Sequence, residues 1–370
     1  MASATLPRPV AAVERVDVSA YRVPTDYPES DGTLVWESTT VIVVELYGGG
    51  MKGIGFTYAD ISTARLIQRT LADVVTGRDA LAVPAAWAAM VRAIRNLGRA
   101  GIASMAIAAI DSALWDLKAR LLDLPLVTLL GAARNGVPIY GSGGFTSYSN
   151  EQLQQQLANW VESGIGMVKM KIGTHPERDV ERVRAAREAI GPTTRLFVDA
   201  NGAYCRKQAL ALAEVFSQYD VSWFEEPVSS DDLAGLHLMR DRGPVGMEIA
   251  AGEYGYDLGY FRRMLEAEAV DVIQADASRC AGVSEFMRVA ALCEARSLPL
   301  SAHCAPSLHL HPGCSVTQLR HLEYFHDHVC CDHLLFDGVV EPRNGLLYPD
   351  LTRPGLGLEL KRPDAAHYAL

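Results

Sequence analysis

The amino-acid sequence predicts an α/β protein whose larger part is a closed barrel of parallel strands. After residue 131, short apolar strands alternate with helical segments of about ten to fifteen residues, which is typical of a parallel sheet. Eight such strands can be placed with seven helical segments between them, and eight parallel strands suggest a closed barrel. Nearly every strand ends in a charged or protonatable residue. A doubly wound open sheet is the structural alternative.

The part of the chain before this repeat is predicted to be an α+β unit. Residues 11 to 58 contain β-branched and alternating apolar stretches, which favour strands. Within them, the stretch from Pro24 to Val35 is rich in Pro, Asp, Ser and Gly, which favours a loop. Residues 63 to 122 show helical spacing, most clearly in the Ala- and Leu-rich segment from Ala106 to Leu122.

The predicted strands of the repeat each lie about one β-then-α unit apart. They are Pro138–Ser142, Met167–Ile172, Leu196–Asn201, Val221–Glu225, Met247–Glu253, Val270–Asp276, Leu298–His303 and His321–Phe325. The tail that follows is rich in Pro and Gly and has no place in the repeat. We therefore expect three parts: a capping domain over residues 1–135, a barrel over residues 136–340, and a segment, 341–370, that packs back on the capping domain.

Composition excludes several classes of protein. Of 370 residues, 49% are hydrophobic and 21% are charged, which rules out disorder across the chain. The net charge of −10 argues against a nucleic-acid partner, and no apolar run is long enough to span a membrane. Met1 to Pro9 has no apolar core of a secretory signal, and the seven Cys include no CxxC pair. We therefore expect reduced thiols and a cytoplasmic protein.

Three acids at successive strand ends predict a metal site. All strands of a parallel barrel end on one face, so the polar residues that close them converge on one cavity. Asp199, Glu225 and Glu253 close three successive strands. Each acid alone would more simply be a helix cap or a surface ion pair, but burying the series is costly without a compensating role. Hard divalent cations prefer such oxygen ligands, so the expected metal is Mg²⁺.

Two lysines and a histidine are candidate acid–base groups. Lys169 and Lys171 are two residues apart and so point to the same side of their strand, where like charges would depress both pKa values. Such a shift makes a lysine a base near neutral pH. His303 lies one strand beyond Asp276, whose carboxylate would fix the imidazole tautomer and raise its basicity. The alternatives are a solvent-facing lysine pair and a histidine satisfied in the core.

Two further patterns are rejected as sites. Gly48-x-Gly50-x-x-Gly53 matches the dinucleotide-binding fingerprint, but it lies between two predicted strands and opens no helix, so we expect a hairpin turn. Seven of the ten His fall between His303 and His333, but their spacings fit no zinc signature, so most are expected at the surface or in packing.

These segments together resemble the enolase superfamily, and within it the mandelate-racemase-like branch. The resemblance is carried by Lys169-Met-Lys171-Ile-Gly173, Val198-Asp-Ala-Asn201, Trp223-Phe-Glu225-Glu-Pro227, Ala251-Gly-Glu253, Ala275-Asp276 with Gly282-Val283, Ser301-Ala-His303 and, earlier, Ala109-Ile-Asp-Ser-Ala-Leu-Trp-Asp116. It covers about residues 12 to 360 and implies a modified TIM barrel, (β/α)7β. An α+β capping domain would be formed by the N-terminal segment and the C-terminal tail.

The resemblance also implies a role for each matching residue. Asp199, Glu225 and Glu253 match the Mg²⁺ ligands of the family. Lys171 matches the base on one face of the substrate, with Lys169 as its neighbour beside the substrate.

On the other face, His303 paired with Asp276 matches the second acid–base group. Glu323 matches the acid that hydrogen-bonds the substrate carboxylate, and Asn201 matches a polar side chain near the substrate. Tyr254 and Arg279 depart from the residues common at their positions, which leaves the core chemistry intact and the exact substrate open.

The chemistry implied by the resemblance is Mg²⁺-dependent abstraction of the proton α to a carboxylate through an enediolate. The leading hypothesis is dehydration of an acid sugar, an aldonate or aldarate, to a 2-keto-3-deoxy acid. The second is a racemase or epimerase of a 2-hydroxy acid. A cycloisomerase or dipeptide epimerase is less favoured, since those usually carry a Lys in place of Asp276. A non-catalytic binding protein is least favoured, because every ligand and base is present.

Specificity is expected from two loops of the capping domain, Pro24 to Val35 and Gly50 to Thr57, which would close over the barrel mouth. They contain Asp26, Tyr27 and Lys52, with Trp36 nearby. The expected partner is a small-molecule carboxylate, and a symmetric homo-oligomer is expected from the habits of the family.

Overall fold

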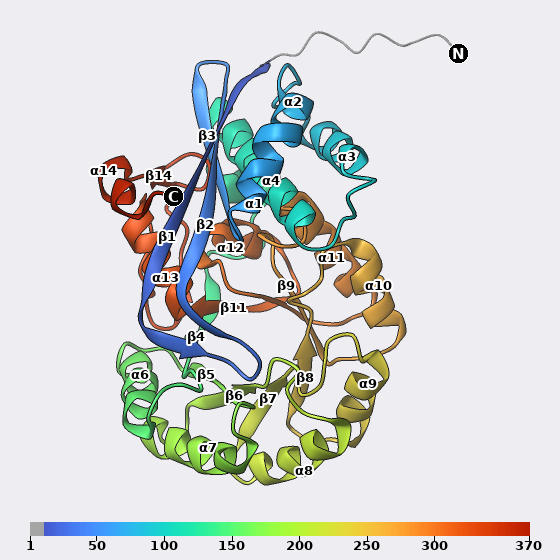
Figure 1. Cartoon of the computed structure of the whole chain (residues 1–370), viewed down its shortest axis with the longest axis vertical. Helices are drawn as coiled ribbons and strands as arrows, with labels where there is room; N and C mark the ends of the chain where they lie inside the picture. The colour runs from blue at the N-terminus through green and yellow to red at the C-terminus, as the bar shows by residue number, and fades with distance from the viewer. Residues whose placement is uncertain (1–10) are drawn as a thin grey trace.

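The computed structural model describes residues 11–370, so the prediction about Met1 to Pro9 lies outside the described residues. A small antiparallel sheet with a group of helices stands at one end, and a ring of strands and helices forms the other (Figure 1). Within the described range, no helix has both the length and the apolar character needed to cross a membrane.

The capping sheet has the order β1-β2-β3 and is antiparallel throughout. Its strands are β1 (Val13–Ser30), β2 (Val35–Gly48) and β3 (Met51–Tyr58). The prediction of strands within residues 11 to 58 is therefore confirmed. One face of the sheet packs on helix α4 through a separate hydrophobic core that includes Ile42, Val44 and Leu46.

The predicted loop from Pro24 to Val35 is largely wrong. β1 continues to Ser30, and Glu29 pairs with Trp36 across an irregular register that begins at Pro24. Only residues 31–34 lie outside the strands. The polar composition was a poor guide to the structure of this stretch. Pro is compatible with extended backbone, and pairing with β2 stabilises these residues as a strand. The hairpin of β1 and β2 therefore forms a long arm that reaches toward the barrel (Figure 1).

The β2–β3 connection is a hairpin turn, as predicted for the glycine-rich segment. Gly49 and Gly50 have φ of +58° and +76°, the left-handed values that a tight two-residue turn requires. Further along β3, Gly55 packs directly on the backbone of α4, where an added Cβ would lie 2.3 Å from the Ala109 carbonyl oxygen.

Short helices cover the capping sheet around one long, almost fully buried helix, α4. They are α1 (Ser62–Leu66), the π-helical turn η1 (Ile67–Leu71), α2 (Ala72–Val75), α3 (Val83–Ala93), α4 (Ile102–Leu121) and α5 (Leu126–Leu130). The predicted helical region, residues 63 to 122, is confirmed with breaks between the pieces.

All eight predicted strands form one parallel barrel. They are β4 (Val137–Gly143), β5 (Met167–Lys171), β6 (Arg195–Asp199), β7 (Val221–Glu225), β8 (Glu248–Ala251), β9 (Val272–Ala275), β10 (Leu300–Ala302) and β11 (Leu319–Phe325). β11 pairs in parallel with β4, with Leu322 opposite Ile139, so the sheet closes and the open-sheet alternative is wrong.

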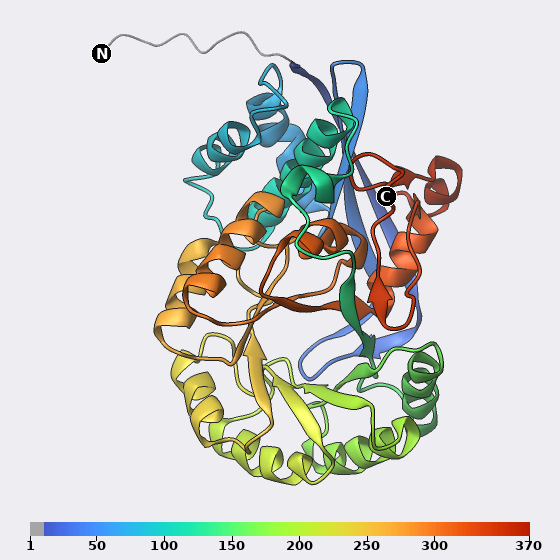
Figure 2. The ribbon, with the colours of Figure 1, turned by 180° about the vertical axis from the view of Figure 1, so that it is seen from behind.

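Seven helices alternate with these strands and give the (β/α)7β pattern. They are α6 (Asn150–Glu162), α7 (Pro176–Ile190), α8 (Arg206–Ser217), α9 (Leu233–Arg242), α10 (Leu258–Glu266), α11 (Val283–Ala295) and α12 (Pro306–Ser315). Helices α6 to α10 form the outer rim in both views (Figure 2). Tyr140, Phe197 and Trp223 pack together in the barrel interior, with the buried His321 against their rings.

The last part of the chain contacts both the barrel and the capping sheet. Its elements are α13 (His326–Leu335), β12 (Phe336–Asp337), β13 (Leu346–Leu347), β14 (Glu359–Leu360), α14 (Arg362–Ala365) and the 3-10 turn η2 (Ala366–Tyr368). β13 pairs with β4, while Arg362 Nη2 lies 2.6 Å from Glu45 Oε2 on β2. Figure 2 shows the C-terminus beside the first strands.

Candidate active site

A pocket of about 360 Å³ opens where the barrel strands end, beneath the arm of the capping sheet. Side chains from both parts of the chain line it. The barrel contributes Lys171, Asn201, Glu253, Tyr254, Arg279, His303, Cys304, Phe325, Asp327 and His328, and the cap contributes Asp31, Leu34, Trp36, Ser38, Thr39, Thr40, Tyr58, Ala59 and Asp60.

The two lysines of β5 point to the same side of the strand, as predicted, and both reach the same carboxylate. Lys171 Nζ lies 2.5 Å from Asp199 Oδ2, and Lys169 Nζ lies 3.2 Å from that atom. Lys169 Nζ also lies 2.5 Å from Glu225 Oε1. Glu225 Oε2 accepts a hydrogen bond from Trp223 Nε1 at 3.0 Å. All of these side chains are buried, so their charges interact with little screening from solvent.

The predicted depression of the lysine pKa values is wrong for this arrangement. Burial lowers the pKa of Lys171, and Lys169 adds to that, but the charges of Asp199, Glu253 and Glu225 together leave the pKa above its usual value. Burial also opposes the charge of Lys169, whose pKa is nevertheless raised well above its usual value by Glu225 and Glu323. The effect of one lysine on the pKa of the other could be judged from the sequence. The carboxylates that raise both pKa values come from other strands and reach the lysines only in the folded barrel.

His303 is held between carboxylates. Its Nδ1 lies 3.0 Å from Asp276 Oδ2, the predicted pair, while its Nε2 lies 3.2 Å from Glu253 Oε2 and 3.6 Å from Glu323 Oε2. Burial lowers the pKa of His303, but Cys304, Glu253 and Glu323, together with the hydrogen bond to Asp276, raise it well above its usual value. The carboxylates on both sides of the ring therefore favour its charged form.

Asp276 is fixed by the turn that follows its strand. Ser278 donates from both its backbone nitrogen and its hydroxyl to Asp276 Oδ1, each at 2.7 Å. Burial raises the pKa of this carboxyl, but the hydrogen bond and charge of His303 lower it below its usual value. Arg279 lies 3.7 Å from Asp276 Oδ2 and 3.1 Å from Glu253 Oε1, so its guanidinium bridges the two acids.

Glu323 is buried away from the pocket surface, whereas Asn201 lines the pocket. Glu323 is fully buried, where its Oε1 accepts from Ser142 Oγ at 2.6 Å and its Oε2 accepts from the Cys304 backbone nitrogen at 3.1 Å. Burial raises its pKa, but Lys169 and His303 lower it below its usual value. Asn201 lines the pocket, and its Oδ1 accepts from Lys171 Nζ at 3.2 Å.

The three predicted metal ligands suit a hard divalent cation. Asp199, Glu225 and Glu253 are buried and offer only oxygen atoms. Burial and the charge of Asp199 raise the pKa of Glu225 to about 8, so Glu225 is the one of the three whose charge the neighbouring cations compensate least. Glu253 Oε2 is buried and accepts no well-aligned hydrogen bond. Ligand atoms of Glu225 and Glu253 lie within 4.8 Å of one another and of His303.

The pocket wall contributed by the cap was only partly predicted. Asp31 and Leu34 lie in the first predicted loop and line the pocket, but no residue of the second loop, Gly50 to Thr57, does so. Lys52 instead lies 3.2 Å from Glu45 on the capping sheet. The order of strands could have shown this, because the tight turn at Gly49 leaves the opposite end of the hairpin to face the barrel.

Two other residues were missed or misplaced. Arg279 was singled out only as a departure from the family, although its position three residues after Asp276 places it on a strand-end turn at the pocket. Tyr27 packs edge-on against Tyr148, with ring centroids 6.3 Å apart, and does not line the pocket.

Comparison with known proteins covers nearly the whole chain. Residues 16–131 match the family model described as mandelate racemase / muconate lactonizing enzyme, N-terminal domain, and residues 152–365 match enolase C-terminal domain-like. The chain is 31% identical to L-talarate/galactarate dehydratase of Salmonella typhimurium, over 94% of this chain and 89% of the relative. It is also 31% identical to 3,6-anhydro-alpha-L-galactonate cycloisomerase of Streptomyces coelicolor, over 94% of this chain and 97% of the relative.

Solved structures with similar folds support the same family assignment. A mandelate racemase/muconate lactonizing enzyme-like protein of Rubrobacter xylanophilus has a TM-score of 0.95 and 56% identity, covering 97% of this chain and 100% of that chain. The Salmonella typhimurium dehydratase, solved with Mg and L-lyxarohydroxamate, has a TM-score of 0.90 and 29% identity, covering 100% of this chain and 96% of that chain.

Proposed function

The chain belongs to the mandelate racemase/muconate lactonizing enzyme family of the enolase superfamily, and we propose that it is a Mg²⁺-dependent acid-sugar dehydratase. One observation carries the proposal. Lys171 ends β5, whereas Asp276 and His303 follow β9 and β10 on another part of the barrel rim, and both sides meet the same group of buried carboxylates. The similarity to a talarate/galactarate dehydratase supports an aldonate or aldarate as substrate.

We assign the metal to Asp199, Glu225 and Glu253, the oxygen-only set at the ends of β6, β7 and just beyond β8. When bound, Mg²⁺ supplies positive charge where the substrate carboxylate becomes more negative. Lys169 and Glu323 border this set, and we assign them to the side of the pocket floor that the substrate carboxylate approaches. Asn201, hydrogen-bonded to Lys171, positions that lysine and borders the substrate.

The proton steps fall to Lys171 and His303. Lys171 Nζ or His303 Nε2 removes the proton from the carbon α to the carboxylate. The hydroxyl on the next carbon then leaves as water, with a proton delivered by His303 Nε2, and the C–O electron pair departs with it. The resulting enol tautomerises to a 2-keto-3-deoxy acid, so the net change is the loss of one water. Asp276 holds His303 in the orientation that both steps need.

The test is an incubation of the full chain with Mg²⁺ and a library of acid sugars in D₂O, followed by mass measurement. A keto product that has lost one water and gained one deuterium at the carbon next to the keto group is the expected result. His303→Asn should abolish it, whereas His175→Asn, at an exposed histidine outside the pocket, should leave it unchanged. Full activity of His303→Asn would exclude the assigned role.

A racemase or epimerase is the second candidate, because Lys171 and His303 could serve opposite faces of one carbon. Deuterium incorporation at the α-carbon without loss of water would favour that reaction. Isomerisation of an anhydro sugar acid to a keto acid without loss of water would instead match the cycloisomerase relative.

A further inference from the structure

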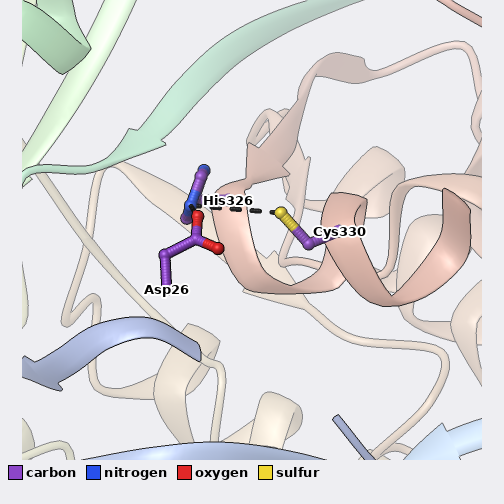
Figure 3. Close-up of side chains that lie close together, drawn as sticks. All are labelled: Asp26, His326 and Cys330. Carbon is purple, nitrogen blue, oxygen red and sulfur yellow. Dashed lines mark hydrogen bonds and ion pairs between the residues drawn. The ribbon is translucent and has the colours of Figure 1, made fainter. Parts of the chain in front are cut away.

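A second group of metal-ligating side chains lies outside the active-site pocket, between the capping arm and helix α13. Asp26 stands in the irregular part of β1, while His326 and Cys330 stand one helical turn apart on α13 (Figure 3). His326 Nε2 lies 3.3 Å from Asp26 Oδ2 and 4.0 Å from Cys330 Sγ. One ligand atom from each residue lies within 4.8 Å of the other two. The three side chains thus converge on one point.

A small cavity lies at the same place. Its volume is about 20 Å³, room for one water-sized particle, and the three side chains help to line it. Asp327 also lines the cavity, is only 5% exposed, and has an Oδ1 that accepts a hydrogen bond from none of residues 11–370. Its Oδ2 accepts from Trp36 Nε1 at 2.8 Å. A buried carboxylate oxygen without a partner is costly, so it points to a bound cation or donor.

We propose that Asp26, His326 and Cys330 form a site for Zn²⁺ or a similar borderline cation, separate from the carboxylate set in the barrel. A thiol, an imidazole and a carboxylate are the donors that zinc accepts, whereas Mg²⁺ prefers oxygen alone. Three protein ligands leave a fourth tetrahedral position for water. The side chain of Asp26 is 67% exposed, so the ion can reach the site from solvent.

The position of this site gives it a structural consequence. Asp26 belongs to the arm of the capping sheet, and α13 follows the last barrel strand, so the ion ties the two together. Asp327 and Trp36 line the active-site pocket and are hydrogen-bonded to each other. The ion therefore fixes the arm at the wall of that pocket. The proposal does not depend on which reaction the pocket carries out.

The test uses Co²⁺ as a spectroscopic probe for the zinc site in the full chain, stripped with a chelator and kept in excess Mg²⁺ throughout. Cobalt bound to a thiolate gives a charge-transfer band, so the wild type should show one that saturates at one equivalent. The band should vanish in Cys330→Ser. It should persist in Cys205→Ser, at an exposed cysteine, and in Cys304→Ser, which removes the cysteine beside His303.

Affinity and stability provide independent measurements. Asp26→Asn and His326→Asn should weaken Zn²⁺ binding at least about tenfold, and Zn²⁺ should raise the Tm of the wild type but not of Cys330→Ser. Because Asp26 is exposed, its variant tests the site even if Cys330→Ser fails to fold. Absence of a thiolate band in the wild type would overturn the proposal. A band lost in Cys304→Ser and kept in Cys330→Ser would overturn it as well, by placing the ion in the active-site pocket.

Discussion

Lys169 and Lys171 both contact Asp199, but their other contacts differ. Lys169 is fully buried and its Nζ lies 2.8 Å from Glu323 Oε1 as well as 2.5 Å from Glu225 Oε1. Lys171 lines the pocket and has Asn201 as its other partner. We infer that Lys169 neutralises acids that would otherwise repel one another, and that Lys171 is the lysine available for proton transfer.

At the residue scale, Asp276→Asn tests how much His303 depends on the charge of its partner Asp276. The variant keeps the shape of the side chain but removes the charge that holds His303 Nδ1 at 3.0 Å. We expect kcat to fall by about 10²- to 10⁴-fold, because the tautomer is no longer fixed. Since Asp276 helps to raise the pKa of His303, the limb of the pH–rate profile that belongs to His303 should move to lower pH.

The measurement is kcat/KM as a function of pH. Ser278→Ala is the matched control, because it removes one of the two donors to Asp276 Oδ1 and keeps the carboxylate, so its effect should be smaller. A profile of Asp276→Asn that coincides with the wild type would contradict the pairing.

Metal binding gives a second prediction at this scale. At a Mg²⁺ concentration about 100 times its Kd, the ion should stabilise the wild type by about 2.7 kcal/mol, which a chelator removes. Glu225→Gln should lose most of this difference in Tm, because it removes one of three carboxylates. Glu248→Gln, at the other end of the barrel on β8, should retain it. Equal Mg²⁺-dependent shifts in both variants would argue against Glu225 as a ligand.

The residue-level predictions succeeded where chain order alone decides position. Asp276 and His303 close neighbouring parallel strands, so the 3.0 Å contact between their side chains followed from the repeat. The pKa of Lys171 did not follow, because it depends on distances to Asp199 and other acids on separate strands. Arg279 was visible as an unusual residue, but its bridge between Glu253 and Asp276 needs the turn geometry.

At the scale of elements, β1 shows how tertiary pairing overrides local composition. The stretch after Pro24 has the residues of a loop, and only the partner strand β2 extends it as far as Ser30. By contrast, the eight barrel strands were found because each is apolar, short and bounded by turns within a few residues of sequence. Their exact ends shifted by up to two residues, as at Val270 before β9, since hydrogen-bonded pairing sets the ends.

The contact between β3 and α4 is testable by adding one methyl group. In Gly55→Ala the new Cβ would lie 2.3 Å from the Ala109 carbonyl oxygen and 2.4 Å from the Ala113 nitrogen, both of them backbone atoms of α4. The helix would have to move, so we expect a loss of about 1–3 kcal/mol or more in the free energy of unfolding. Urea denaturation measures it.

Gly166→Ala is the control for this substitution. An added Cβ there meets no heavy atom within 4 Å, and its φ is not left-handed, so the free energy of unfolding should change by less than about 0.5 kcal/mol. Equal effects of the two substitutions would show that the close approach of β3 to α4 does not limit stability.

At the scale of the whole molecule, helix α4 joins the capping domain to the barrel. Asp111 accepts hydrogen bonds from the backbone nitrogen of Ser284 at 2.9 Å and from its hydroxyl at 2.7 Å, in the first turn of α11. Asp116 accepts from the backbone nitrogen of Leu356 at 2.6 Å, in the C-terminal tail. The sequence motif that contains both residues was recognised, but their partners, 173 and 240 residues away, depend on how the domains pack.

The contact between Asp111 and α11 should be visible in the pH dependence of stability. Burial raises the pKa of Asp111 from 3.8 to about 7, despite the hydrogen bonds from Ser284 that lower it. Between these two values the native state holds a proton that the unfolded state has released. The contribution of Asp111 to the free energy of unfolding is therefore largest below about pH 4 and falls as the pH rises toward about 7.

Asp111→Asn removes this titration and so isolates it. The free energy of unfolding of the wild type minus that of the variant should decrease as the pH rises from about 4 to about 7, and should then stay constant. Urea denaturation of both proteins across this range measures the difference, and titrations common to both cancel. A difference that stays flat or increases with pH would mean that Asp111 is ionised throughout, and that the packing of α4 on α11 is held by a charged cap rather than by a neutral one.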